Sequence, residues 1–298
     1  MKSKAKNGAA RGTALIITAG VFWGSMGIFV RALGKYGLSS IQIVCLRLTV
    51  AAVVFAALHA VLERDKLWIS PRDIPLFLGL GLGSILFFTV CYFTAINMMP
   101  LSTAAILLYT SPIWVMLMSC VFFREKLSVK KLCALACAFG GCVLVSGLSR
   151  GGLNVLGLLI GLGSGIGYGL YSILGSVALR KYEPLTVTTY AFLFSAAGSW
   201  FICRPAEMLS IAVSLPPLGF ALDVLGIAVV TAVAPYLLYT LGLKNTPASK
   251  AAIMATIEPL VATVLGIAVF SEPLTPVAAA GIVLILSAIV LLNAHRKE

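Results

Sequence analysis

The chain has 298 residues, of which 60% are hydrophobic and only 11% are charged. A soluble globular protein carries about 25% charged residues, so this composition excludes a soluble fold. The net charge of +12 alone would suggest nucleic acid as a partner, but the charge is distributed as the loops of a membrane protein require.

Ten apolar stretches follow one another along the chain, each long enough to cross a bilayer as a helix of about 20 residues. They lie at 13–31, 39–61, 74–97, 102–123, 129–148, 153–179, 184–203, 220–243, 248–270 and 276–293. A transmembrane β-barrel would alternate polar and apolar residues in segments of about ten, whereas these stretches are apolar on all faces. The sequence therefore predicts an all-α membrane protein with ten transmembrane helices.

Basic residues are shared unequally between the two sets of alternate loops. Seventeen of the 22 Lys and Arg residues fall on the side of the amino terminus, and only Arg31, Lys35, Arg150 and Arg204 fall on the other; Arg47 lies inside a stretch. Short cytoplasmic loops carry the excess of basic residues. We therefore expect both termini to be cytoplasmic, in a chain that spans the inner (plasma) membrane many times and has the lipid bilayer, not nucleic acid, as its surroundings.

An internal repeat with an offset of 147 residues relates the two parts of the chain. The matched positions are Tyr92 and Tyr239, Pro100 and Pro247, 104–106 and 251–253, Pro112 and Pro259, Phe123 and Phe270, Glu125 and Glu272, and Leu127 and Leu274. Five helices in each repeat is an odd number, so the second repeat must enter the membrane from the opposite side. The sequence thus predicts two inverted repeats, over 13–148 and 153–293, an arrangement that recurs in secondary transporters.

The motifs Trp23-Gly24-Ser25, Arg47, Glu125, Glu258-Pro259 and Glu272 together resemble the EamA family of the drug/metabolite transporter superfamily. The resemblance covers residues 13–293 as two tandem EamA units. It implies a ten-helix bundle with a central cavity lined by the first, third and fourth helices of each half. It also implies export or exchange of amino acids or similar small metabolites. One departure is Ala134, where the matched position of the second half is Gly281.

Pro112 and Pro259 lie near the middle of the fourth and ninth stretches, at matched positions of the repeat. Proline removes a backbone hydrogen bond and kinks a helix. Carbonyl groups freed at membrane depth are tolerated where they face protein or a wet cavity. The two prolines therefore indicate either a hinge in each half or a static kink kept for packing.

Two charged residues lie well inside apolar stretches. Glu258 is close to the midplane, where an ionisable group is costly and usually faces a cavity or a partner. It could bind a substrate amine or carry a coupling proton; otherwise it pairs with a neighbouring helix. Arg47 could hold a substrate carboxylate or pair with Glu258, but we favour a structural arginine satisfied by carbonyl groups at helix ends.

Aromatic residues in mid-stretch positions are the third group of candidates. Trp23, Tyr92, Tyr168 and Tyr239 fall on helices that line the cavity in the resembling family, and their rings can stack on an apolar solute. The competing interpretation is an interfacial belt, which fits mid-stretch positions poorly. We expect these four residues and Glu258 to bind substrate.

Residues for catalysis or metal binding are scarce. The two histidines are His59 and His295, and no Ser-His pairing, phosphate loop or cluster of metal ligands is present. We predict a transporter, not an enzyme, that needs no cofactor, takes a small-molecule substrate and is an exporter of metabolites, amino acids above all. The alternatives are a channel-like permease and a transporter of other metabolites or drugs, and whether the chain forms a homodimer stays open.

Overall fold

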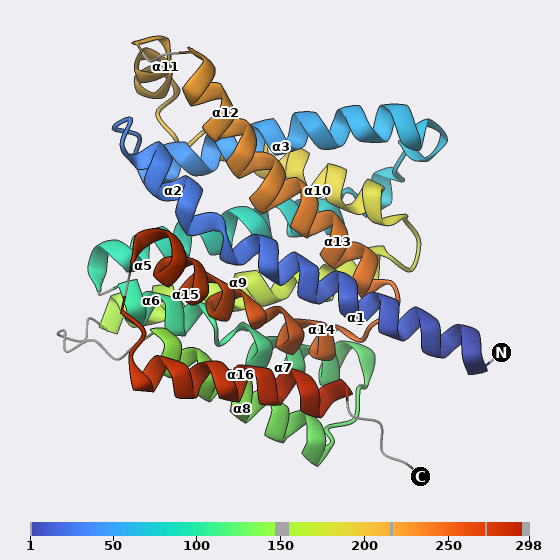
Figure 1. Ribbon diagram of the computed structural model, residues 1–298. Helices are drawn as coiled ribbons and strands as arrows, with labels where there is room; N and C mark the ends of the chain where they lie inside the picture. The colour runs from blue at the N-terminus through green and yellow to red at the C-terminus, as the bar shows by residue number, and fades with distance from the viewer. Residues whose placement is uncertain (1, 100, 147–154, 215–216, 272, 294–298) are drawn as a thin grey trace.

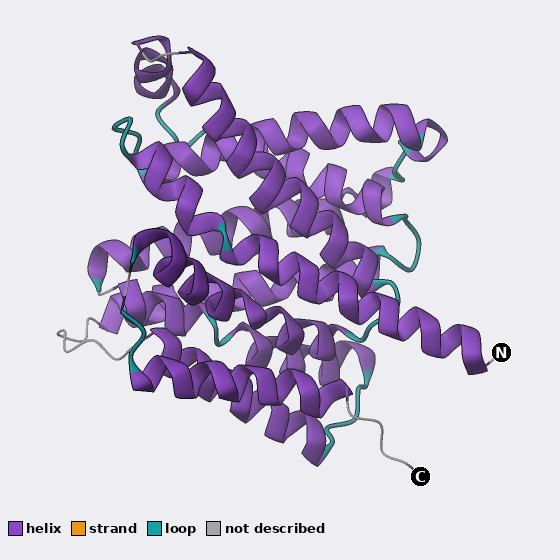
Figure 2. Cartoon of the chain, in the orientation of Figure 1, coloured by secondary structure: helices purple, strands orange, loops and turns teal. Residues whose placement is uncertain are grey.

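The computed structural model of the chain describes residues 2–99, 101–146, 155–214, 217–271 and 273–293, and every regular element among them is a helix (Figure 2). The helices of the first half are α1 (Lys2–Gly24), α2 (Met26–Gly34), α3 (Ser40–Leu62), α4 (Ile74–Leu78), α5 (Phe87–Met98), α6 (Leu101–Leu108), α7 (Ser111–Phe123) and α8 (Val129–Ser146). Short 3-10 turns, Arg64–Lys66 and Pro71–Asp73, join α3 to α4.

The second half of the described chain is built in the same way. Its helices are α9 (Val155–Ala178), α10 (Pro184–Ser199), α11 (Pro205–Ser214), α12 (Pro217–Ala228), α13 (Ala234–Leu243), α14 (Ala248–Ala255), α15 (Ile257–Phe270) and α16 (Pro276–Asn293). The predicted repeat boundaries at 148 and 153, and the repeat partners Pro100 and Glu272, lie outside the described residues.

Nine helical stretches within the described residues are long and apolar enough to cross a membrane. They correspond to nine of the ten predicted stretches, which makes the chain an all-α, multi-spanning membrane protein. The remaining stretch, predicted at 184–203, forms α10, which has only 16 residues. At 1.5 Å per residue such a helix is about 24 Å long, shorter than the roughly 30 Å hydrocarbon core.

An additional helix occupies the segment expected to be a loop between the seventh and eighth stretches. This helix, α11, begins at Pro205, a favourable first-turn residue, and carries Glu207 in its first turn, where a negative charge is stabilised by the helix dipole. It projects from the bundle beside α12 (Figure 1). Its Met208 is buried against the cluster that contains Leu33 and Ile227, which anchors α11 to the ends of α2 and α12.

Three of the spanning stretches are broken near their middle. The breaks separate α1 from α2 at Ser25, α6 from α7 at Thr110, and α14 from α15 at Thr256. At each break a hydroxyl group donates a hydrogen bond to the carbonyl three residues earlier, with distances of 2.6 to 2.7 Å. Such a bond competes with the regular helical pattern and bends the chain.

Pro112 and Pro259 both lie in the first turn of the helix that follows a break, α7 and α15 respectively. A proline is well tolerated there because its missing N–H is among those that a helix start leaves unbonded. The structure therefore explains why the chain tolerates both prolines at membrane depth, while their role as hinges stays a prediction.

The third and eighth spanning stretches each contain a π-helical segment, Gly79–Leu86 and Val229–Val233. The two segments overlap when one is shifted by the 147-residue offset of the sequence repeat. A π-helical turn changes the hydrogen-bonding pattern of the backbone, and such turns are frequent at functional sites.

The helices pack mainly across the two halves, in pairs that match each other. Helix α1 packs on α13 and α15, while α9, its counterpart in the second half, packs on α5 and on α6 and α7. Helices α3 and α10 pack together, and α8 packs on α16. Helix α1 begins and α16 ends on the same side of the bundle, at the right of Figure 1.

Glycines allow the closest of these approaches. A methyl group added at Gly24 of α1 would lie 2.8 Å from the Glu258 carbonyl oxygen, and one at Gly165 of α9 would lie 2.7 Å from the Leu107 carbonyl oxygen. Real Cβ atoms do not come so close to a backbone oxygen. The helix backbones meet because the side chains are absent, as small residues permit in membrane proteins.

Gly165→Ala should therefore push α9 away from the break between α6 and α7, because the new methyl group also meets Thr110 Oγ1. Overpacking of this kind costs about 1–3 kcal/mol, so we expect a lower melting temperature in detergent. Gly163→Ala is the matched control on the same helix, since its nearest neighbour, Cys91 Sγ, lies at an ordinary 3.5 Å. Equal melting temperatures for the two variants would contradict the close contact.

Candidate functional site

A cavity of about 370 Å³ lies in the middle of the bundle. This is near the lower limit of small-molecule sites, which range from roughly 300 to 1,000 Å³. Its walls come from α1, α2, α3, α5, α6, α9, α12, α13 and α15. The aromatic residues among its lining are Trp23, Phe88, Tyr92, Phe93, Tyr109, Tyr168 and Tyr236. The surface offered to an occupant is mainly apolar and aromatic.

Glu258 and Arg47 are the charged residues among the described lining of this cavity. Glu258 is in the first turn of α15, directly after the break at Thr256, and is 8% exposed. Tyr168 of α9 donates its hydroxyl hydrogen to Glu258 Oε2 at 3.0 Å. The break places the carboxylate at the positive end of a helix dipole, where a negative charge is stabilised.

Arg47 lies on α3 and is 6% exposed. Its Nη2 atom donates a hydrogen bond of 2.6 Å to the Thr231 carbonyl oxygen, in the π-helical segment between α12 and α13. Among the described residues Arg47 forms no ion pair, so it is not paired with Glu258 although both line the same cavity.

Exposed residues in the cavity lining show where the cavity reaches the surface of the bundle. Its rim includes Ser40, in the first turn of α3, and Leu101, at the start of α6, and both residues are exposed. We call this the open end. Between α2, α6 and α15 the cavity adjoins a second hollow of about 360 Å³, which Pro259 and Arg31 help to line.

Aromatic rings close the opposite side of the cavity. The Trp23 ring centroid lies 5.2 Å from that of Tyr236 and 5.3 Å from that of Tyr239. Below these rings only about 20 Å³ of free space is left. Tyr239 and Ser172 hydroxyl groups are hydrogen-bonded at 2.7 Å, and Tyr171 bonds Thr240 Oγ1 at 2.8 Å. These side chains hold α9 to α13 and seal the cavity at its floor.

Ion pairs join the helices beyond that floor, at what we call the closed end. Lys181 pairs with Asp73, and Lys131 pairs with Glu125, which also accepts a hydrogen bond from Ser249. The first pair connects the turn after α9 with the start of α4, and the contacts of Glu125 connect the end of α7 with α8 and α14. Opening the cavity toward this end requires several of them to break.

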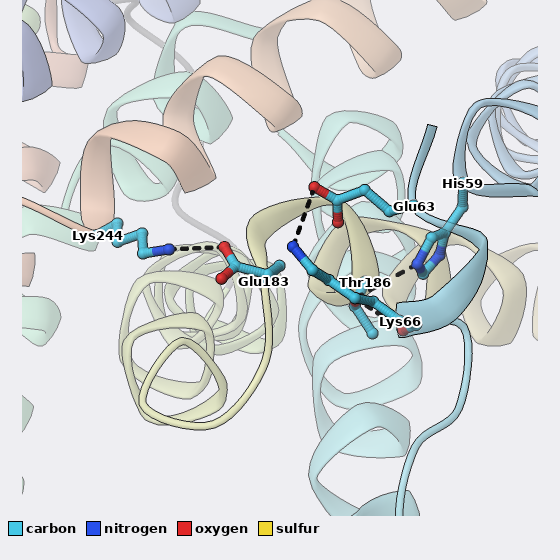
Figure 3. A network of polar contacts seen from close by, with 6 residues as sticks. All are labelled: His59, Glu63, Lys66, Glu183, Thr186 and Lys244. Carbon is cyan, nitrogen blue, oxygen red and sulfur yellow. Dashed lines mark hydrogen bonds and ion pairs between the residues drawn. The ribbon is translucent and has the colours of Figure 1, made fainter. Parts of the chain in front are cut away.

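The polar network in Figure 3 belongs to the same closed end. Lys244, after α13, donates a hydrogen bond of 2.6 Å to Glu183 Oε2, before α10. Nearby, the Thr186 hydroxyl group contacts His59 Nε2 at 3.4 Å and donates to the Lys66 carbonyl oxygen at 3.3 Å. The hydrogen bond from Lys244 holds the pKa of the Glu183 carboxyl below its usual range.

The structure brings together five of the residues singled out from the sequence: Trp23, Arg47, Tyr92, Tyr168 and Glu258 all line the central cavity. Tyr239 does not line it; its ring lies under Trp23, on the sealed side, and is 4% exposed. Pro112 is buried outside the cavity lining. The binding roles themselves stay predictions.

Sequence reasoning missed two aromatic residues of the cavity lining and the carbonyl group that holds Arg47. Phe88 stands one helical turn before Tyr92 and stacks near Tyr168, with ring centroids 5.2 Å apart; the i, i+4 spacing could have indicated it. Phe93 had no such signal. Nothing in the sequence marked the Thr231 carbonyl oxygen, because a π-helical turn has no sequence signature comparable to a proline.

Comparisons with known proteins settle the family. The sequence model of the EamA-like transporter family matches this chain twice, over residues 10–147 and 155–294. The chain belongs to the EamA-like transporter family. It is therefore a membrane transporter and not an enzyme, as the resemblance found in the sequence implied.

Relatives extend over nearly the whole chain. An "uncharacterized transporter" of Archaeoglobus fulgidus is 31% identical over 265 residues, which cover 89% of both chains. The "uncharacterized transporter YwfM" of Bacillus subtilis is 25% identical over 285 residues, covering 95% of this chain and 94% of the relative. A solved crystal structure superposes with a TM-score of 0.80 at 18% identity, covering 95% of this EamA chain and 96% of that chain. At that identity the likeness supports the fold alone.

The pair of Glu183 and Lys244 should contribute a small, pH-dependent stability to this EamA protein. Exposed pairs are worth about 0.2–1 kcal/mol, so Glu183→Lys should lower the melting temperature slightly, and Lys244→Glu in the same chain should restore it. Equal melting temperatures for the single and double variants would contradict the pairing.

The pH dependence of that effect has a defined sign. Because the folded-state pKa of Glu183 is lowered, its contribution is complete above the ordinary carboxyl pKa of about 4.3. It is lost as the pH falls through the folded-state pKa. The difference in melting temperature between wild type and Glu183→Gln should therefore be present at pH 7 and vanish in acid.

Proposed function

We propose that this protein is a secondary transporter that exports small organic metabolites, above all amino acids or related compounds, by alternating access. The observation that carries the proposal is the central cavity, which is open at Ser40 and Leu101 and sealed below Trp23 by packed rings and ion pairs. A carrier needs one access path closed while the other is open.

The proposal includes ten crossings arranged as two inverted repeats. Helix α10 would be the seventh crossing, shortened at Ser199 but packed on α3 and α13 within the bundle. The two matches to the family model, and the matched helix pairs formed across the halves, support this arrangement. An inverted repeat can exchange the conformations of its halves and so open one site to either side.

We place the closed end in the cytoplasm and the protein in the inner (plasma) membrane. The basic residues favour this orientation, because most of the ion-paired lysines, among them Lys131, Lys181 and Lys244, gather at the closed end. The open end then faces outward. The conformation would be one that releases or takes up the solute on the outer side.

A facilitative, channel-like permease is the alternative function. A continuous pore would need a path past Trp23, Tyr236 and Tyr239, and the described side chains leave about 20 Å³ there. The sealed floor therefore favours a carrier over a channel.

Counterflow in proteoliposomes tests the proposal directly. Liposomes are loaded with one unlabelled amino acid at high concentration, and the same labelled amino acid is added outside in trace amounts, across a panel of aromatic and aliphatic side chains. We expect at least one amino acid to accumulate inside above its equilibrium level. Entry that only equilibrates would indicate a channel, and overshoot with another metabolite but no amino acid would overturn the proposed substrate class alone.

Glu258→Gln should abolish transport or remove its pH dependence, because the variant keeps the shape of the side chain but can neither be charged nor release a proton. The folded yield should stay close to that of wild type. Glu207→Gln, on the exposed helix α11, is the matched control and should transport normally. Unchanged, still pH-dependent transport by Glu258→Gln would refute a role for this carboxylate.

A further inference from the structure

Arg47 is a buried charge whose partners do not account for it. It is 6% exposed and lines the central cavity. One hydrogen bond, from Nη2 to the Thr231 carbonyl oxygen, holds the guanidinium, and Nε has no hydrogen-bond partner in the described part of the chain. A guanidinium has five N–H donors, and Glu258, which attracts Arg47 electrostatically, forms neither a hydrogen bond nor a close ion pair with it among the described residues. Such a group implies a partner that arrives from the cavity.

Packing alone does not require an arginine at this position. Helix α10 is the counterpart of α3, and its corresponding segment, Ala191–Phe194, is apolar. Helix α10 packs on the π-helical segment Gly79–Leu86 as α3 packs on Val229–Val233. In that matched contact Gly81 lies directly against the Phe194 Cβ atom and the Ala191 carbonyl oxygen, both at 2.7 Å from its virtual Cβ. The other half of the molecule builds the same helix–helix contact without a charge.

The rest of the cavity supplies a second, separate charge. Glu258 lines the same space from α15, hydrogen-bonded to Tyr168, and forms no ion pair with Arg47 among the described residues. The cavity wall thus carries one cationic group, Arg47, and one anionic group, Glu258, and much of the rest of the wall is aromatic. An uncharged solute would match neither of these two charged groups, and a singly charged solute would match only one of them.

We propose that Arg47 binds the carboxylate of the transported solute, while Glu258 faces its amine, so that the solute is an amphoteric molecule with an apolar or aromatic body. The planar guanidinium offers parallel N–H donors that match a carboxylate. The inference rests on the proposed transport function and extends it by assigning the anion-binding residue. A cavity of about 370 Å³ suits a solute of this size class.

Three probes that differ only in their charged groups test this assignment on the purified, full-length protein. They are L-phenylalanine, 3-phenylpropionate, which lacks the amine, and phenethylamine, which lacks the carboxylate. Each is titrated while the melting temperature is followed, because a ligand of the folded state raises it by mass action. We expect L-phenylalanine to stabilise wild type most, and 3-phenylpropionate to stabilise it more weakly.

Arg47→Gln should weaken the binding of both carboxylate-bearing probes about 10- to 100-fold, as the loss of a charged hydrogen-bonding partner does. It should leave the effect of phenethylamine unchanged, which a merely structural role for Arg47 would not predict. Arg47→Lys keeps the charge and should retain part of the carboxylate binding, and it serves if Arg47→Gln folds poorly. Arg204→Gln, exposed beside Glu207 outside the cavity lining, removes the same charge and should change nothing.

Two outcomes would overturn the assignment. One is equal stabilisation of wild type and Arg47→Gln by 3-phenylpropionate. The other is a wild-type protein that neither L-phenylalanine nor 3-phenylpropionate stabilises, whether or not phenethylamine does. Neither result touches the proposed transport function, which counterflow with the wider panel decides separately.

Discussion

The structure depends on two close backbone contacts, that of α1 with α15 and that of α9 with α6 and α7. Gly24 lets the backbone of α1 approach the Glu258 carbonyl oxygen, and Gly165 lets α9 approach the Leu107 carbonyl oxygen. Trp23 precedes Gly24 on α1, and Tyr168 lies about one turn after Gly165 on α9. The same contacts therefore place both rings and the Glu258 carboxylate around the central cavity. In a bilayer no hydrophobic force draws helices together, so close packing of small residues takes its place.

Irregular backbone is the means by which the cavity keeps its charges. The break at Thr256 gives Glu258 the start of a helix, and the π-helical segment around Thr231 directs a carbonyl oxygen to Arg47. In a regular helix the backbone N–H groups near Glu258 and the Thr231 carbonyl group would be bonded within the helix, and neither Glu258 nor Arg47 would interact with them. Backbone irregularity at membrane depth is tolerated where protein or a cavity surrounds it, and within the described residues these departures lie beside the cavity.

Most of the fold followed from the sequence, because the length and spacing of apolar stretches decide which segments can cross a bilayer. Nine crossings lie where they were expected, while α10 ends four residues before its predicted end, since the apolar run continues through Trp200 and Phe201 after the helix has stopped. The cavity was less predictable. Mid-stretch aromatics indicated Trp23, Tyr92 and Tyr168, but neither period nor spacing tells that Tyr236 faces the cavity while Tyr239, three residues later, faces its seal.

The different positions of Tyr239 and its repeat partner Tyr92 have a mechanistic meaning under the alternating access proposed above. Tyr239 lies in the sealed floor, bonded to Ser172, while its repeat partner Tyr92 lines the open cavity. If the halves exchange conformations, the two tyrosines exchange environments, so that Tyr92 enters a seal at the outer end as Tyr239 is released from the inner one. The conformation seen in this structure is then stabilised by contacts at the closed end. These are the rings around Trp23, the hydrogen bond between Ser172 and Tyr239, and the exposed ion pairs. Each is individually weak, which is what a transporter that must pass readily between two conformations requires.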